Sequence, residues 1–110
     1  MIVNEMVEKL NLSVVSGHKG LSRAVTGGYT SDLLSDVMGH AIEGQVWITL
    51  QTHKNVMAIA SLKELAAIIL VNSHQPDADT KEQSETEGIP VLSTNLSNFE
   101  ITGKLYSLIS

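Results

Sequence analysis

The run Ala66-Ala67-Ile68-Ile69-Leu70-Val71 decides the fold class of this chain. It has the length of a strand, contains no polar residue, and lies in an apolar stretch bounded by Glu64 and Asn72. A strand with one face in water alternates apolar and polar residues, whereas a strand buried on both faces reads as a continuous apolar run. Such strands occur in parallel sheets that helices cover on both sides, so this segment predicts an α/β fold.

Segments typical of strands and helices alternate along the rest of the chain. Strands are expected at residues 12–16, 24–29, 45–50, 66–71 and 89–93. Helices are expected at residues 2–10, 30–39, 52–64, 77–87 and 95–109. The candidate caps are Thr30, Ser31 or Asp32 for the second helix, Asn55 or Thr52 for the third, and Ser97 or Asn95 for the last, while Pro76 and Asp77 mark the start of the fourth. Strands separated by helical segments of this length form crossover units in a largely parallel sheet. The sequence therefore predicts a single domain over residues 1–110, with helices on both faces of a mostly parallel or mixed sheet of about five strands. This is a three-layer α/β architecture.

The composition excludes several classes of protein. The net charge is -5 and the seven basic residues are scattered, so the concentrated positive surface that nucleic-acid binding needs is missing. There is no cysteine, which excludes disulfides and thiolate metal sites and fits a reducing cytoplasm. The apolar runs are too short to span a bilayer, and the N-terminus lacks the basic region of a signal peptide. We therefore expect a cytoplasmic domain with no nucleic-acid or membrane partner.

No motif for catalysis or phosphate binding is complete. Gly17-His18-Lys19-Gly20 has glycines and a lysine, but it lacks the spacing of a P-loop and the helix that follows one. There is no nucleophile elbow. His53 and His74 follow neighbouring expected strands. A metal site there would need a third ligand, for which Asp32 or Asp77 would have to serve. We expect no enzyme activity, no cofactor and no metal site.

Polar segments follow four of the expected strands, at residues 29–32, 51–55, 72–75 and 93–95. The carboxyl ends of parallel strands share one edge of the sheet, where open α/β folds bind ligands. Hydroxyls, amides and helix N-termini at one edge suit an anion or a nucleotide, although the same residue types also cap helices and close turns. The residues that we expect to contact a ligand are Arg23, Thr26, Gly27, Gly28, Thr52, His53, Asn72, Ser73, Ser93 and Thr94.

An ordered set of segments resembles a known family. Leu21-Ser22-Arg23-Ala24-Val25-Thr26-Gly27-Gly28-Tyr29, with the residues that follow it up to Val37, is similar to the DRTGG domain. The resemblance continues through residues 43–49, 65–70 and 87–94, and so covers nearly the whole chain. Ser22 stands where the family has its aspartate, which puts any role of a carboxylate at this position in doubt.

The resemblance implies the fold of the N-terminal domain of HPr kinase/phosphorylase. DRTGG domains also occur inside phosphotransacetylases and beside CBS domains in regulated pyrophosphatases, where they resemble regulatory, dimer-forming modules. The kinase chemistry of the first group belongs to a separate P-loop domain, which this sequence lacks. We therefore predict a non-catalytic regulatory or interaction domain that self-associates as a homodimer, with a partner protein as a further interpretation. The alternative is a sensor of a small ligand, an adenine nucleotide or another phosphate-bearing metabolite.

Overall fold

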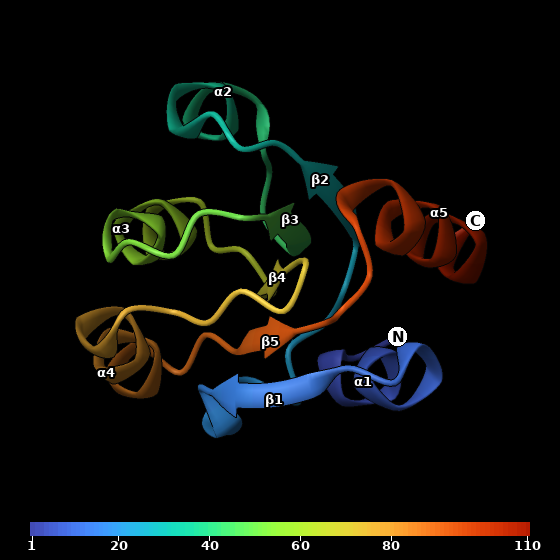
Figure 1. The fold of residues 1–110 in the computed structure, drawn as a ribbon, viewed down its shortest axis with the longest axis horizontal. Coiled ribbons are helices and arrows are strands. Elements are labelled where there is room, and N and C mark those ends of the chain that lie inside the picture. The colour runs from blue at the N-terminus through green and yellow to red at the C-terminus, as the bar shows by residue number, and fades with distance from the viewer.

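The computed structural model describes residues 1–110 and contains one five-stranded sheet with helices on both faces (Figure 1). The elements follow in the order α1 (Val3–Leu10), β1 (Ser13–Ser16), η1 (His18–Gly20), β2 (Gly27–Thr30), α2 (Leu34–His40), β3 (Gln45–Thr49), α3 (Asn55–Leu62), β4 (Ala67–Leu70), α4 (Ala78–Glu87), β5 (Val91–Ser93) and α5 (Asn98–Ile109). The strand order is β1-β5-β4-β3-β2. Strands β2 to β5 are parallel, and β1 pairs antiparallel with β5. The predicted α/β fold with a mixed sheet is confirmed.

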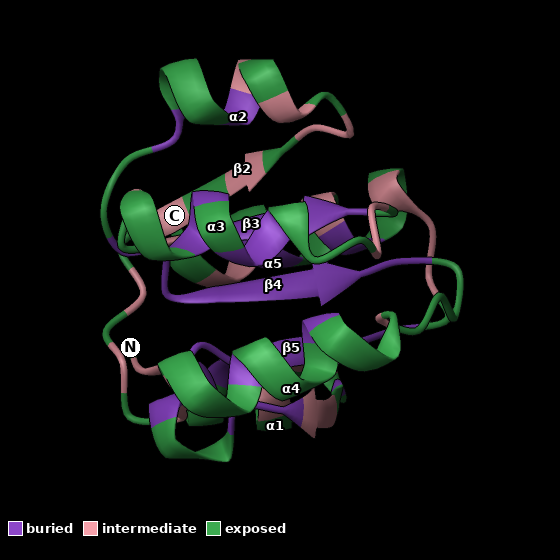
Figure 2. Cartoon of the chain, turned by 90° about the vertical axis from the view of Figure 1, so that its left-hand side faces the viewer, coloured by how far each residue is buried: buried purple, intermediate pink, exposed green.

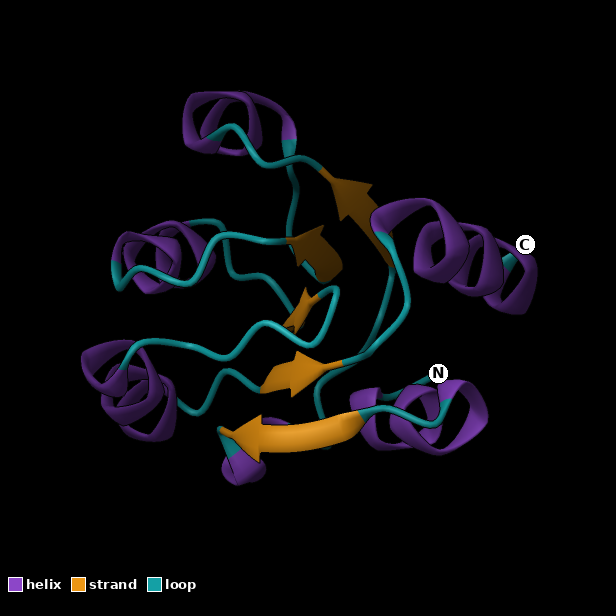
Figure 3. Ribbon diagram, viewed as in Figure 1, coloured by secondary structure: helices purple, strands orange, loops and turns teal.

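The helices form two layers around the sheet. Helices α1 and α5 cover one face, while α2, α3 and α4 cover the other (Figures 1 and 3). Strand β4 is buried along its whole length (Figure 2). Its alternate residues serve two separate cores, since Ile69 packs with Met6 and Leu105 on one face and Ile68 packs with Trp47 on the other. The continuous apolar run therefore marks a central strand, as its sequence predicts.

Helix α4 buries polar side chains instead of an apolar stripe. Its inward positions are Thr80 and Ser84, which are both almost completely buried. Each is hydrogen-bonded: the Thr80 hydroxyl donates to the Thr52 carbonyl at 2.8 Å, and the Ser84 hydroxyl donates to the Ile89 carbonyl at 2.6 Å. The Ser16 hydroxyl donates in turn to Ser84 Oγ at 2.8 Å. A helix with few apolar residues is thus held by satisfied buried hydrogen bonds.

Two predicted helix starts are wrong. Helix α2 begins at Leu34 and not at residues 30–32, because the Asp32 side chain bonds to the loop after β3 and does not cap α2. Helix α3 begins at Asn55, and neither Thr52 nor Asn55 caps it with its side chain. For α5, the sequence left Ser97 and Asn95 open, and Ser97 is the cap, with Glu100 completing a capping box. No helix combines the length and the apolar character that crossing a membrane requires.

Candidate functional site

The ten expected ligand residues lie at two opposite edges of the sheet. Gly27 opens β2 and pairs with Gln45, the first residue of β3, so the Arg23–Gly28 segment lies at the amino edge of the parallel strands. The other six residues lie at or just after the carboxyl ends of β3, β4 and β5. The structure therefore does not bring the glycine motif and the polar loops together in one site.

At the amino edge, the family motif makes structural contacts. Arg23 Nε donates to the Gly88 carbonyl at 2.9 Å, and the Thr26 hydroxyl donates to the Glu43 carbonyl at 3.0 Å. A Cβ at Gly28 would lie 2.9 Å from Leu105 Cδ2, so the glycine lets α5 pack closely on β2. Arg23 and Thr26 line a small hollow of about 280 Å³ that Glu43 also lines. A second carboxylate, that of Glu64, lines it too, which disfavours an anion there.

The expected residues of the loop after β3 make local contacts at the carboxyl edge. His53 Nδ1 accepts a hydrogen bond from the backbone N–H of Asn55 at 3.1 Å, at the first turn of α3. The Thr52 carbonyl accepts from the Thr80 hydroxyl and from the Asp77 N–H, and so ties this loop to the start of α4. Both residues thus act as connections between elements.

The loops after β4 and β5 are joined to each other. The backbone N–H of Asn72 donates to the Leu96 carbonyl at 2.9 Å, and that of Ser73 donates to the Thr94 carbonyl at 2.8 Å. Ser93 and Thr94 are both 7% exposed. Thr94 Oγ1 accepts from the Leu96 N–H at 3.2 Å. Of the six expected residues at this edge, Thr94 alone lines one of the five hollows of the structure.

Asp32 organises the carboxyl edge, a role that the sequence analysis missed. Its Oδ1 accepts from the Thr49 hydroxyl and from the Leu50 N–H, both at 2.9 Å, and its Oδ2 accepts from Asn98 Nδ2 at 3.3 Å. Its carbonyl accepts from Gln51 Nε2 at 2.8 Å. We call these five residues the Asp32 hub. The available signal was an aspartate two residues after a parallel strand, but an aspartate before a helix is equally typical of a helix cap.

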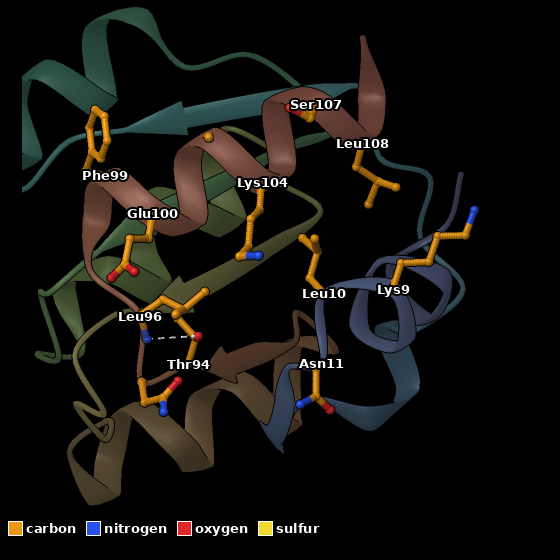
Figure 4. A pocket seen from close by; sticks show the side chains of 12 residues that line it. Lys9, Leu10, Asn11, Thr94, Leu96, Phe99, Glu100, Lys104, Ser107 and Leu108 are labelled. Carbon is orange, nitrogen blue, oxygen red and sulfur yellow. Dashed lines mark hydrogen bonds between the residues drawn. The ribbon is translucent and has the colours of Figure 1, made fainter.

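The largest hollow is a groove of about 890 Å³ between α1 and α5 (Figure 4). We call it the α1–α5 groove, and it is lined by Lys9, Leu10, Asn11, Thr94, Asn95, Leu96, Phe99, Glu100, Gly103, Lys104, Ser107 and Leu108. Glu100 is its one carboxylate, and the backbone N–H of Ser97, donating at 3.1 Å, lowers the pKa of Glu100. The lining comes from both ends of the chain, so no local sequence pattern could have predicted it.

Four groups have shifted pKa values: Tyr29 and Asp36, whose side chains are hydrogen-bonded to each other at 2.9 Å, and Glu85 and Glu100, which lie elsewhere. The Ser31 and Tyr29 hydroxyls lower the pKa of Asp36, and the backbone N–H of Gly17 lowers the pKa of Glu85. Neither carboxylate lines a hollow with a second shifted group. No three His, Asp or Glu side chains are grouped so as to hold a metal ion. The structure thus brings together no acid–base pair in a cavity.

Comparison with known proteins gives the family of this chain and a solved structure of similar fold. The DRTGG domain profile matches residues 5–108. The chain belongs to the DRTGG domain family. No curated protein matches it. Among solved structures, this DRTGG domain is similar to the CBS and DRTGG domains of the regulatory region of Clostridium perfringens pyrophosphatase, crystallised with the activator diadenosine tetraphosphate. The TM-score is 0.71 at 13% identity, over 94% of this chain and 45% of that one. The chain thus spans less than half of that neighbour, and the likeness shows the fold alone.

Proposed function

We propose that this DRTGG domain is a non-catalytic regulatory module that associates with a second copy of itself. The observation that carries the proposal is an exposed aromatic stripe on α5. Phe99 is 89% exposed and Tyr106 is 69% exposed, and their spacing of seven residues puts both rings on one side of the helix. Gly103 lies between them, with no atom within 4 Å of where its Cβ would be. This face is therefore open and apolar.

Two further exposed apolar side chains belong to segments that the Asp32 hub joins to the start of α5. Phe99 follows Asn98 of the hub, and Leu33, which is 63% exposed, follows Asp32. Leu50 is a hub residue itself and is 38% exposed. We call Phe99, Gly103, Tyr106, Leu33 and Leu50 the association face. Because hydrogen bonds join the segments that present it, this face is held in place before a partner arrives, which lowers the entropy lost on binding.

A dimer of this chain would need to cover only a modest part of its surface. A stable interface buries about 800 Å² on each partner. This is about a seventh of the 5509 Å² of surface that the chain exposes. A two-fold interface uses the same patch on both copies, so one apolar face is sufficient. Exposed apolar patches of several hundred Å² mark interaction sites on soluble proteins. The exposed rings of the association face are what such an interface would bury.

Light scattering after size-exclusion chromatography tests this proposal. We expect the wild-type chain to elute with twice its 11.8 kDa mass. The double variant Phe99→Ser/Tyr106→Ser should elute as a monomer. Leu62→Ser is the matched control, because Leu62 is 69% exposed but lies on α3, on the other face of the sheet. A wild-type monomer at high concentration, or a dimer in all three proteins, would contradict the proposal.

A second candidate function is the sensing of a small phosphate-bearing ligand. The observation that favours it is the nucleotide activator bound by the pyrophosphatase regulatory region of similar fold. In this chain the contacts would come from the carboxyl edge, from Thr52, His53, Asn72, Ser73, Ser93 and Thr94. A ligand at a hundred times its dissociation constant stabilises by about 2.7 kcal/mol, which a thermal-shift screen detects. The absence of any shift with nucleotides and sugar phosphates would argue against this function.

A further inference from the structure

We infer that the free edge of β2 is an interaction surface that pairs antiparallel with β2 of a second copy, so that the two sheets join into one. This inference rests on the proposed self-association and assigns backbone groups to it. Strand β2 is the last strand in the order β1-β5-β4-β3-β2 and has only β3 as a neighbour. In Figure 1 it lies at the end of the sheet, between the layers of α2 and α5. One side of its backbone is therefore open to a further strand.

The open backbone groups belong to Gly28 and Thr30. The N–H of Ser31 donates to the Ile48 carbonyl of β3 at 3.2 Å. The backbone groups of successive strand residues point to opposite sides, so Tyr29 also faces β3, whereas Gly28 and Thr30 face away from it. Both of these residues are exposed, and no hydrogen bond outside the sheet involves their backbone. A strand laid along this edge would find donors and acceptors in place.

The opposite edge of the sheet is protected against such pairing. Strand β1 carries a β-bulge between Val14 and Ser16, where its register against β5 shifts. Bulges twist an edge strand away from a further partner, and charged residues and prolines also block pairing. Strand β2 pairs with β3 in unbroken register, and its sequence Gly27-Gly28-Tyr29-Thr30 contains no charged residue and no proline. Of the two edges, that of β2 is the one open to a partner strand.

Side chains on both faces of the sheet hold β2 in position. The Tyr29 hydroxyl donates to Asp36 Oδ2 of α2 at 2.9 Å. The hydroxyls of Thr30 and Thr102, a residue of α5, are hydrogen-bonded to each other at 2.8 Å. Because α2 and α5 lie on opposite faces of the sheet, these contacts fix the strand from both sides (Figure 3). An edge that is already ordered in a single copy loses little further entropy when it pairs.

The edge continues into the association face, which identifies the partner as a second copy of this chain. Tyr106 of that face lines a small hollow of about 70 Å³ together with Gly28 and Thr30. Leu33 of the same face follows β2 at the start of α2. A two-fold axis through the sheet runs β2 antiparallel to its own copy and brings α5 beside α5 and α2 beside α2. With Gly28 opposite Thr30 of the partner subunit, each of these residue pairs exchanges both of its hydrogen bonds.

Strand pairing and apolar burial have different roles in this arrangement. Strand β2 has four residues, and an isolated pair of strands is marginally stable in water. The exposed apolar side chains of the association face supply the hydrophobic contribution. The strand pair sets the register in which those side chains meet, so its loss should weaken the dimer.

Thr30→Pro tests the pairing, because proline removes the open N–H and puts a ring carbon in its place. That N–H has no partner in a single copy, so the variant should fold with the fluorescence of Trp47 unchanged. Thr30→Val is the matched control, since it also loses the Thr102 hydrogen bond but keeps the N–H. By analytical ultracentrifugation, the dissociation constant of the dimer should rise roughly tenfold or more in Thr30→Pro relative to Thr30→Val. Equal constants in the two variants would overturn the strand pairing.

Amide hydrogen exchange of the wild-type chain, carried out at high and low protein concentration and read by NMR, is a test that needs no variant. The amides of Gly28 and Thr30 should exchange roughly tenfold or more slowly in the dimer than in the monomer, whereas the amide of Tyr29 should be protected in both. Fast exchange at Gly28 and Thr30 in a dimeric sample would overturn the strand pairing and leave self-association intact. A chain that is monomeric at every concentration would overturn both.

Discussion

Replacing Asp32 by alanine should destabilise the fold by loosening the loops that meet at the carboxyl edge. Asp32 Oδ1 accepts from the Thr49 hydroxyl and the Leu50 N–H, and Oδ2 accepts from Asn98. Thr49 is fully buried, so its hydroxyl would lose its acceptor away from water. A hydrogen bond to a charged group contributes about 1.5–3 kcal/mol, and water can replace part of this at the partly exposed Leu50. We expect a loss of about 2–4 kcal/mol in the free energy of unfolding.

Asp32→Asn should destabilise the fold less than Asp32→Ala, because the Asn98 side chain has an oxygen that makes no hydrogen bond. Asn98 Oδ1 is buried and has no hydrogen-bond partner. An asparagine at position 32 keeps one oxygen for Thr49 and Leu50 and presents an amide nitrogen to Asn98. If the Asn98 amide turns over, its free oxygen accepts from that nitrogen. The expected loss is then about 1 kcal/mol, the difference between charged and neutral hydrogen bonds.

Urea denaturation at constant pH measures both variants. The single tryptophan, Trp47, is a suitable probe, because its Nε1 donates to the Ser31 carbonyl at 2.8 Å, next to Asp32. Glu82→Ala, on the exposed side of α4, is a control that should change stability by no more than about 0.5 kcal/mol. This account of the hub would be refuted if Asp32→Ala lost no more stability than the control. It would also be refuted if Asp32→Asn lost as much stability as Asp32→Ala.

Three further outcomes can be checked by denaturation. Glu85→Gln should be less stable than wild type at pH 7, because the Gly17 N–H lowers the pKa of Glu85 in the folded state. The stability that the wild type gains from this is complete above the unfolded pKa of about 4.3 and should disappear as the pH falls through the folded pKa. A stability difference that persists at pH 2 would contradict this prediction. Gly20→Ala should cost about 3 kcal/mol of stability or prevent folding, because its Cβ would lie 2.6 Å from a proline ring carbon and closer still to a carbonyl oxygen. Gly103→Ala should instead raise the stability measured by thermal unfolding by up to about 1 kcal/mol, because the space around its Cβ is open. Ser84→Ala should cost about 1–3 kcal/mol, since a buried hydroxyl and a carbonyl lose their partner, and a neutral result would show that the buried polar contacts of α4 do not hold it.

The alternation of elements was predictable because it depends on local patterns. The uninterrupted run at residues 66–71 predicted a strand with both faces covered, and β4 is that strand. Pro76 and Asp77 marked the start of α4, and Asp77 is its N-cap residue. Errors arose where a side chain had a distant partner. Asp32 looked like a cap for α2, but its carboxylate bonds to Thr49 and Asn98, and no local pattern reports those contacts.

The glycine motif also separates what local sequence predicts from what distant contacts decide. The sequence alone determined the family, because an ordered set of segments resembled the DRTGG domain, and the match over residues 5–108 confirms it. Only the tertiary structure decided what these residues do. It places Arg23 against the end of α4 and Gly28 beneath α5, away from the polar loops at the other edge. The α1–α5 groove likewise exists only once the two ends of the chain pack on one face of the sheet. Local patterning determines the elements, whereas a site depends on residues that the sheet topology brings together.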